Sequence, residues 1–118
     1  MLATAAAVAG AAAAVAVSLA HGEDPPRFAT DVQPIFDAKC VSCHPMAYPY
    51  LDLRAGRSYD DLVRVPAETR PAFHRVLPGR PELSYLLTHP PDPSLRELLA
   101  PADRETIAAL IRAGARND

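Results

Sequence analysis

Aromatic residues are scarce in this 118-residue chain, which has no tryptophan, four tyrosines and three phenylalanines. Neither positive nor negative charge is in marked excess. So few aromatics beside thirteen prolines argue against a strand-rich sandwich, because proline is confined to sheet edges and aromatics favour strands. With 12 basic and 14 acidic residues there is no broad basic surface, so nucleic-acid binding is excluded as a function class. No internal repeat is present. The composition predicts an all-α protein, with short helices joined by proline-rich loops.

Cysteine is also scarce, and its only two copies lie three positions apart in Cys40-Val41-Ser42-Cys43-His44. This C-x-x-C-H spacing is typical of the attachment site of a c-type haem. Two thiols at this distance can add to the two vinyl groups of one haem, and the adjacent imidazole can then reach the iron. The motif therefore predicts one covalent haem, anchored by Cys40 and Cys43 and ligated by His44.

Two other interpretations of the motif are weighed against haem. A disulfide between Cys40 and Cys43 is possible, but no strand–helix pattern around it indicates a thioredoxin-like redox site. A zinc site would need a further ligand, which His74, His89 or a carboxylate can supply. The disulfide would leave the histidine next to Cys43 without a role. The zinc site would make the protein a structural or interaction module.

Residues 2–20 carry no charge and consist almost wholly of alanine and valine. Nineteen such residues are just long enough to cross a bilayer as a helix, and small residues at 18–20 also suit a cleaved signal peptide. A basic residue before the apolar run is missing, and a buried soluble helix is the third interpretation. We expect export, with 1–20 as signal peptide or transmembrane anchor, which places the protein in the periplasm or on the periplasmic side of the inner membrane.

The remaining chain divides into a polar linker over 21–27 and one small domain over 28–118. We expect a helix capped by Thr30 to lead to Cys40, with Val32, Ile35 and Phe36 on its buried face. At this length the core is limited, and a bound haem would supply much of its missing apolar surface.

Three more helices are predicted farther along the chain. Ser58 has the form of a capping box with the acid at position 61, so a short helix should run to about 65. Residues 81–88 read as one two-turn helix with leucines 83, 86 and 87 inward. A closing helix should begin at Pro101, bury Ile107, Leu110 and Ile111, and stop at Gly114.

Over residues 28–115 the sequence resembles the small class I type cytochrome c domains of many bacterial proteins. The resemblance is carried by Val32-Gln33-Pro34-Ile35-Phe36, Cys40-Val41-Ser42-Cys43-His44, Leu51-Asp52-Leu53, Ser58-Tyr59-Asp60-Asp61-Leu62-Val63, Pro78-Gly79, Ser84-Tyr85-Leu86-Leu87 and residues 107–115. It implies a cytochrome c fold of three to five short helices around the haem, after an N-terminal apolar helix. The sequence departs from this family twice, with Leu110 where a tryptophan is frequent and His89-Pro90-Pro91 where a Met-Pro-Pro element supplies the distal ligand.

Four residues compete for the distal position on the iron. Met46 is separated from His44 only by one proline, and two residues span at most about 7 Å, too little to reach the other haem face. His21 lies in the linker, and His74 is a second choice with a surface role as its alternative. His89 occupies the place of the family's methionine and is held by prolines, so we expect it to be the distal ligand, making the iron bis-histidine.

These residues predict a protein that carries one electron at a time and catalyses no reaction on a substrate. We therefore expect it not to be an enzyme itself, although it can be a subunit of a redox enzyme complex. Its partners would be redox proteins or a membrane electron-transport complex. Arg54, Arg57 or Arg80 would pair with the haem propionates. If the sixth position were open, the domain would instead bind a diatomic gas or react with peroxide.

Overall fold

The computed structural model describes residues 24–88 and 98–118, and this part of the chain is all-α, as predicted. Isolated β-bridges occur in the described residues, but no strand does. The elements in chain order are the π-helical turn η1 (Phe28–Val32), α2 (Gln33–Lys39), α3 (Ser58–Leu62), the 3₁₀ turn η2 (Pro81–Leu83), α4 (Tyr85–Thr88) and α6 (Pro101–Arg112).

The first helical segment begins earlier than the predicted cap at Thr30. The chain turns helical at Phe28, and the Asp31 carboxylate accepts the backbone N–H of Arg27 at 2.7 Å, which satisfies a donor at the helix start. Thr30 therefore lies inside η1, and the prediction of a Thr30 cap is wrong. Of the predicted buried face, Val32 and Phe36 are each only 1 % exposed, whereas Ile35 is partly buried against the core.

The closing helix α6 matches its prediction closely. Its proline stands in the first turn, where the missing N–H costs nothing, and Ile107, Leu110 and Ile111 are all buried. The helix ends just before Gly114, whose φ of +106° is a conformation that favours glycine.

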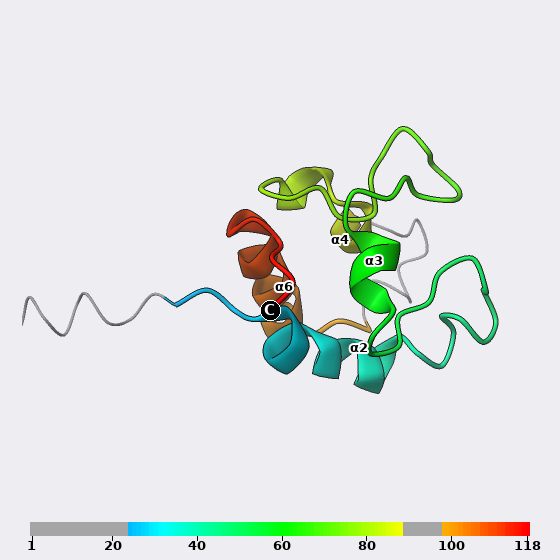
Figure 1. Cartoon of the computed structure of the whole chain (residues 1–118), viewed down its shortest axis with the longest axis horizontal. Helices are drawn as coiled ribbons and strands as arrows, with labels where there is room; N and C mark the ends of the chain where they lie inside the picture. The colour runs from blue at the N-terminus through cyan, green and yellow to red at the C-terminus, as the bar shows by residue number, and fades with distance from the viewer. Residues whose placement is uncertain (1–23, 89–97) are drawn as a thin grey trace, which may run out of the picture.

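Two contacts join the η1–α2 segment to α6 and to the tail that follows it. At one end the backbone N–H of Ala29 donates to the Asp118 carbonyl oxygen at 2.8 Å. At the other end Lys39 Nζ and Asp103 Oδ2 are 2.7 Å apart. The η1–α2 segment thus meets the tail after α6 at one end and the first turn of α6 at the other, and Figure 1 shows α6, in orange to red, crossing η1–α2, in blue to cyan.

A buried polar cluster joins α2 to α3 and to the loop between them. Gln33 Nε2 donates to the Leu53 carbonyl at 2.9 Å, and Ser58 Oγ donates to Gln33 Oε1 at 2.5 Å. The predicted capping box is wrong, because Ser58 is a helical residue whose hydroxyl is used by this cluster, and Asp61 instead accepts the backbone N–H of Asp52 at 2.8 Å. The helix also ends at Leu62, earlier than expected.

The two-turn helix predicted over 81–88 is broken into η2 and α4 at Ser84. This fully buried serine has extended backbone angles, and its hydroxyl bonds to the Leu77 N–H and the Arg80 carbonyl, both at 2.9 Å. The helical hydrogen bonds are interrupted here, because the N–H groups of Tyr85 and Leu86 donate to the carbonyls of His74 and Arg75, at 2.9 and 3.0 Å. Leu87 is buried as predicted, whereas Leu83 is 37 % exposed and so does not point inward.

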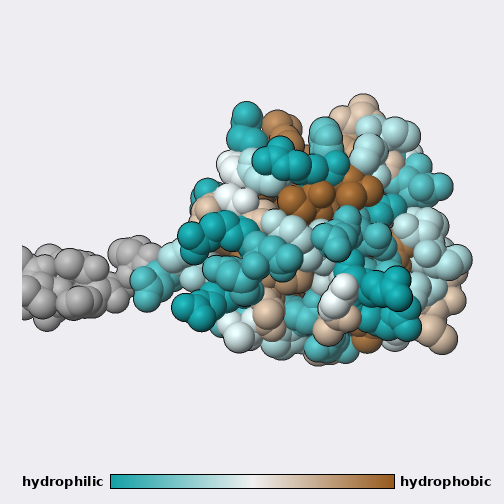
Figure 2. All heavy atoms as spheres, in the orientation of Figure 1, coloured by the Kyte–Doolittle hydropathy of each residue, from teal (hydrophilic) through white to brown (hydrophobic). Residues whose placement is uncertain are grey.

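One apolar core joins these elements, and Figure 2 shows the mainly polar surface around it. Its buried members are Phe28, Val32, Phe36, Leu53, Leu62, Val76, Leu87, Ile107, Leu110, Ile111 and Ala115. Within 24–88 and 98–118 no helix is both long and apolar enough to cross a membrane. The predicted anchor or signal peptide at 2–20 lies outside these ranges.

The Gln33–Ser58 bond gives a first testable prediction. Ser58→Ala leaves the buried Gln33 Oε1 without its donor, so we expect the free energy of unfolding to fall by about 1–3 kcal/mol. Denaturant titration of the two proteins measures this. Thr106→Ala, which removes a hydroxyl bond on the exposed side of α6, is the control and should change stability by less than about 0.5 kcal/mol. Equal effects of the two changes would contradict the role of the cluster.

Candidate functional site

A cavity of about 590 Å³ opens beside the C-x-x-C-H motif. Its volume lies within the range of small-molecule and cofactor sites. The side chains around it are mainly apolar, with several cations among them. Its lining residues are Lys39, Cys40, Cys43, His44, Tyr48, Tyr50, Leu51, Leu53, Leu62, Ala67, Glu68, Thr69, Arg70, Arg75, Tyr85, Leu86, Leu98, Leu99 and Arg104.

The end of α2 and a tight turn after it bring the motif to this cavity. The N–H of Cys40 still donates to the Phe36 carbonyl at 2.8 Å, which continues the helical pattern by one residue. The N–H groups of Cys43 and His44 then both donate to the Cys40 carbonyl, at 3.1 and 2.9 Å. This turn brings Cys40, Cys43 and His44 together in the lining of the cavity.

Both cysteines are free, and their surroundings differ. Cys43 is exposed, whereas Cys40 is half-buried. Burial, together with the nearby Cys43, raises the pKa of the Cys40 thiol to about 11, against the opposing charge of Lys39. Cys40 is therefore held as a neutral thiol at physiological pH.

The imidazole of His44 is held in its neutral form. Burial lowers its pKa, and the charge of Arg75 adds to this effect, although a hydrogen bond with the backbone of Tyr48 opposes it. The buried Nδ1 atom has no hydrogen-bond partner among the described residues. The rings of Tyr48 and Tyr50 flank the imidazole, with centroids 5.5 and 6.1 Å from its own. Neutral imidazole is the form that binds metals.

Cations outnumber acids around the cavity. Lys39, Arg70, Arg75 and Arg104 line it, against the single acid Glu68. Arg104 Nη2 donates to the Leu87 carbonyl at 2.6 Å, which ties α6 to α4 at the cavity rim. No periodic pattern in the sequence marks these arginines, because Arg70 and Arg75 lie in the irregular loop between α3 and η2 and Arg104 lies in α6.

The arginines predicted to pair with propionates are not among the residues that line the cavity. Arg54 Nη2 instead lies 2.7 Å from Asp52 Oδ2, and Arg80 Nε lies 2.5 Å from Glu82 Oε1. Arg57 is exposed and does not line the cavity either. Two of the three arginines thus pair with acids that also lie outside the cavity lining.

The candidate distal ligands are placed as follows. His74 does not line the cavity, and its backbone is engaged in bridges to Pro66 and Ser84. Met46 is 77 % exposed and also lies outside the lining. His89 and His21 fall outside the described residues. Leu86 and Leu98, on either side of the segment that contains His89, both line the cavity.

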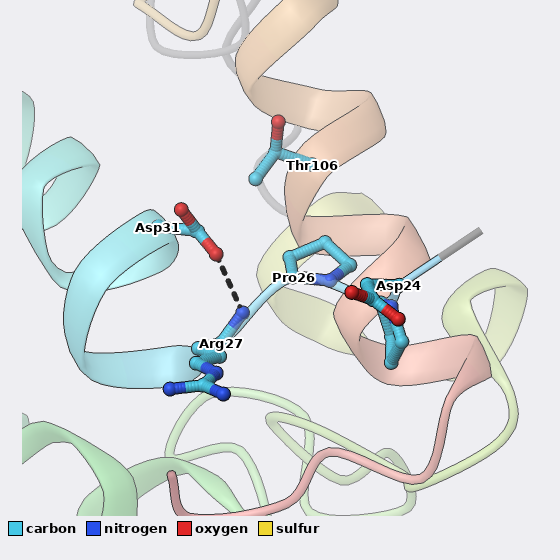
Figure 3. Close-up of a pocket in the computed structure, with 6 residues that line it drawn as sticks. Asp24, Pro26, Arg27, Asp31 and Thr106 are labelled. Carbon is cyan, nitrogen blue, oxygen red and sulfur yellow. Dashed lines mark hydrogen bonds between the residues drawn. The ribbon is translucent and has the colours of Figure 1, made fainter. Parts of the chain in front are cut away.

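A second hollow of about 450 Å³ lies where the chain enters η1, and it is open to solvent. Its lining residues are Asp24, Pro25, Pro26, Arg27, Asp31 and Thr106. Figure 3 shows that the Asp31 carboxylate is already used by the Arg27 N–H. In the part of the chain that the structure describes, no three His, Cys, Asp or Glu side chains gather as they would around a metal ion. This second hollow therefore offers no constellation with an evident chemistry.

The residues around the larger cavity fit a haem. Two thiols and a neutral imidazole with an unpartnered buried nitrogen share one wall. The leucines of the other walls suit an apolar macrocycle, and the excess of arginine suits its two carboxylates. The site would hold the iron through His44 and the ring through Cys40 and Cys43.

Thiol reactivity before haem attachment tests the two cysteine environments. With a pKa of about 11, Cys40 is about 0.1 % thiolate at pH 8, so iodoacetamide should alkylate the exposed Cys43 first. The rate at Cys40 should rise roughly tenfold per pH unit until the pH approaches 11. Peptide mass spectrometry reads both sites, and the unfolded chain, where the rates should converge, is the control. Faster alkylation of Cys40 in the folded protein would contradict the described burial.

Comparisons with known proteins found no match: no protein-family model, no curated protein and no solved structure is similar enough to this chain to be identified as a relative.

Proposed function

We propose that this protein is a mono-haem c-type cytochrome that carries one electron at a time. The observation that supports this most strongly is that Cys40, Cys43 and His44 line one apolar cavity of about 590 Å³. A bound haem would supply the redox chemistry, an iron that alternates between its ferric and ferrous states. No residue around the cavity then needs to act on a substrate.

In this proposal the protein's own residues hold the haem, orient it and shield it from water. Cys40 and Cys43 would hold the ring through thioethers, and His44 would bind the iron through a ring nitrogen. Leu53 and Leu62, both 2 % exposed or less, extend the cavity wall into the core and limit the access of water. Exclusion of water and the identity of the axial ligands together set the reduction potential.

His89 is our proposed distal ligand. The two competitors in the described residues are weakened by their positions, because neither His74 nor Met46 lines the cavity. The leucines at 86 and 98 bring the chain to the cavity on both sides of the segment that holds His89. Imidazole donates more strongly to ferric iron than a thioether does, so the potential lies below that of a histidine–methionine cytochrome.

The proposal extends to the location and the partners of the protein. The uncharged run at 2–20 supports export, either by an uncleaved anchor or by a cleaved signal peptide. Electron donors and acceptors would then be redox proteins of the periplasm or of a membrane complex.

Covalent attachment is the decisive test of this function. Because two thioethers join haem to chain, the purified native protein should keep its colour through acid–acetone extraction and denaturing electrophoresis, and its intact mass should include one haem. Cys40→Ala combined with Cys43→Ala should abolish stable incorporation, whereas the control Ser42→Ala, in the same turn, should not. Haem that extracts into the solvent, or a colourless protein that contains zinc, would refute the proposal.

Absorption spectra of ligand variants test the distal assignment. His89→Ala should give a high-spin or water-ligated haem that takes up added imidazole, because the sixth position has lost its donor. His89→Met should raise the potential and introduce a sulfur-to-iron charge-transfer band that the wild type lacks. His74→Ala is the matched control and should leave the spectrum nearly unchanged.

The reverse pattern, with a high-spin spectrum in the His74 variant and not in the His89 variant, would make His74 the ligand. A high-spin wild-type spectrum that shifts with added gas or peroxide would instead identify an open sixth site.

A further inference from the structure

Arg75 is a buried cation whose charge is not matched within the described residues. Its side chain is 8 % exposed and lines the cavity. Of the five N–H donors of its guanidinium, one on Nη1 goes to the Asp61 carbonyl at 2.9 Å and one on Nη2 to the Tyr50 carbonyl at 3.1 Å. Both acceptors are uncharged backbone oxygens, and the other three donors have no acceptor in 24–88 or 98–118.

A cation that is removed from water without an anion destabilises a protein by several kcal/mol. No carboxylate of the described residues forms an ion pair with Arg75. The nearest candidates are accounted for, because the carboxylate of Asp61 accepts the N–H of Asp52, and Glu68 is an exposed residue. The cavity is the space from which an anion can reach the guanidinium.

We propose that Arg75 binds a carboxylate of the cofactor that Cys40, Cys43 and His44 hold, which makes it the anionic subsite of this cavity. This inference rests on the proposed function, since it needs a planar cofactor that carries carboxylates. The two bonds to backbone carbonyls fix the guanidinium plane in advance, so it can offer its remaining N–H groups as a rigid fork.

The other arginines of the cavity fit this role less well. Arg70 is an exposed residue, so water screens its charge. Arg104 is partly exposed and donates to the Leu87 carbonyl near the rim. Only Arg75 combines burial, a place on the cavity wall and a position close enough to lower the pKa of His44.

The test compares two ligands that differ only at the carboxylates. The full chain, produced without haem, is titrated with ferric mesohaem and with its dimethyl ester, in which the carboxylates are neutral. Mesohaem has ethyl groups in place of vinyls, so the thiols cannot add to it and binding stays reversible. The wild type should bind the free acid at least roughly tenfold more tightly than the ester, because a charge-assisted bond in a buried site is lost with the ester.

Arg75→Gln should reduce this preference to about twofold or less, because glutamine keeps a hydrogen bond to the backbone but no charge. Arg75→Lys, which keeps the charge, should retain most of it. Arg104→Gln is the matched control, an arginine of the same cavity that also donates to a backbone carbonyl, and it should preserve the preference. A purely structural role of Arg75 would weaken both ligands equally and leave the ratio unchanged.

Three results overturn the proposal: a wild type that does not discriminate acid from ester, an unchanged ratio in Arg75→Gln, or loss of the ratio in Arg104→Gln alone. The wild-type comparison decides even if Arg75→Gln does not fold. Failure of the proposed function is recognised separately, because the native protein would then contain no covalent haem, whereas a haem-loaded protein without acid preference refutes only the role of Arg75.

Discussion

The packing of the η1–α2 segment against α6 and the tail that follows it is the constraint on which the rest of the structure depends. It joins the first and last parts of the domain through the bond between Ala29 and Asp118 and the ion pair between Lys39 and Asp103. The second of these links lies one residue before Cys40, so the same contact that closes the domain also fixes where the motif leaves its helix. Partly exposed ion pairs contribute little free energy by themselves, so the buried apolar faces supply most of the stability, and the Lys39–Asp103 pair joins the end of α2 to the first turn of α6.

Helices whose apolar residues recur about every 3.6 residues were predictable from the sequence, since this spacing places those residues on one face that must be buried. The face of Ile107, Leu110 and Ile111 is buried as the 3.6-residue period requires, and Gly114 ends the helix in a positive-φ conformation. The cavity wall was predictable in the same way at Cys40, Cys43 and His44, because a turn of five residues has little freedom to separate them.

Local capping signals failed where a tertiary partner competed for the same side chain. Ser58 has the sequence context of a cap, yet its hydroxyl donates to Gln33, which is distant in sequence. Ser84 interrupts an otherwise regular helical pattern because Leu77 and Arg80 offer it partners. Arg75 was missed for a related reason, since a buried arginine leaves no periodic mark and becomes recognisable only when the loops that bury it are in place.

The cavity and the buried guanidinium of Arg75 could not be predicted from the sequence, and both lower the stability of this small domain when no ligand is bound. A domain of about ninety residues buries only a modest apolar core, and this one surrounds a hollow of about 590 Å³ with leucines on its walls and a buried guanidinium beside it. An apolar hollow forfeits packing contacts, and a buried cation without an anion adds a further cost. A ligand that filled the hollow and met the charge would remove both penalties at once. Binding and folding would then be linked, so that loss of the cofactor lowers the stability of the domain as well as its redox activity.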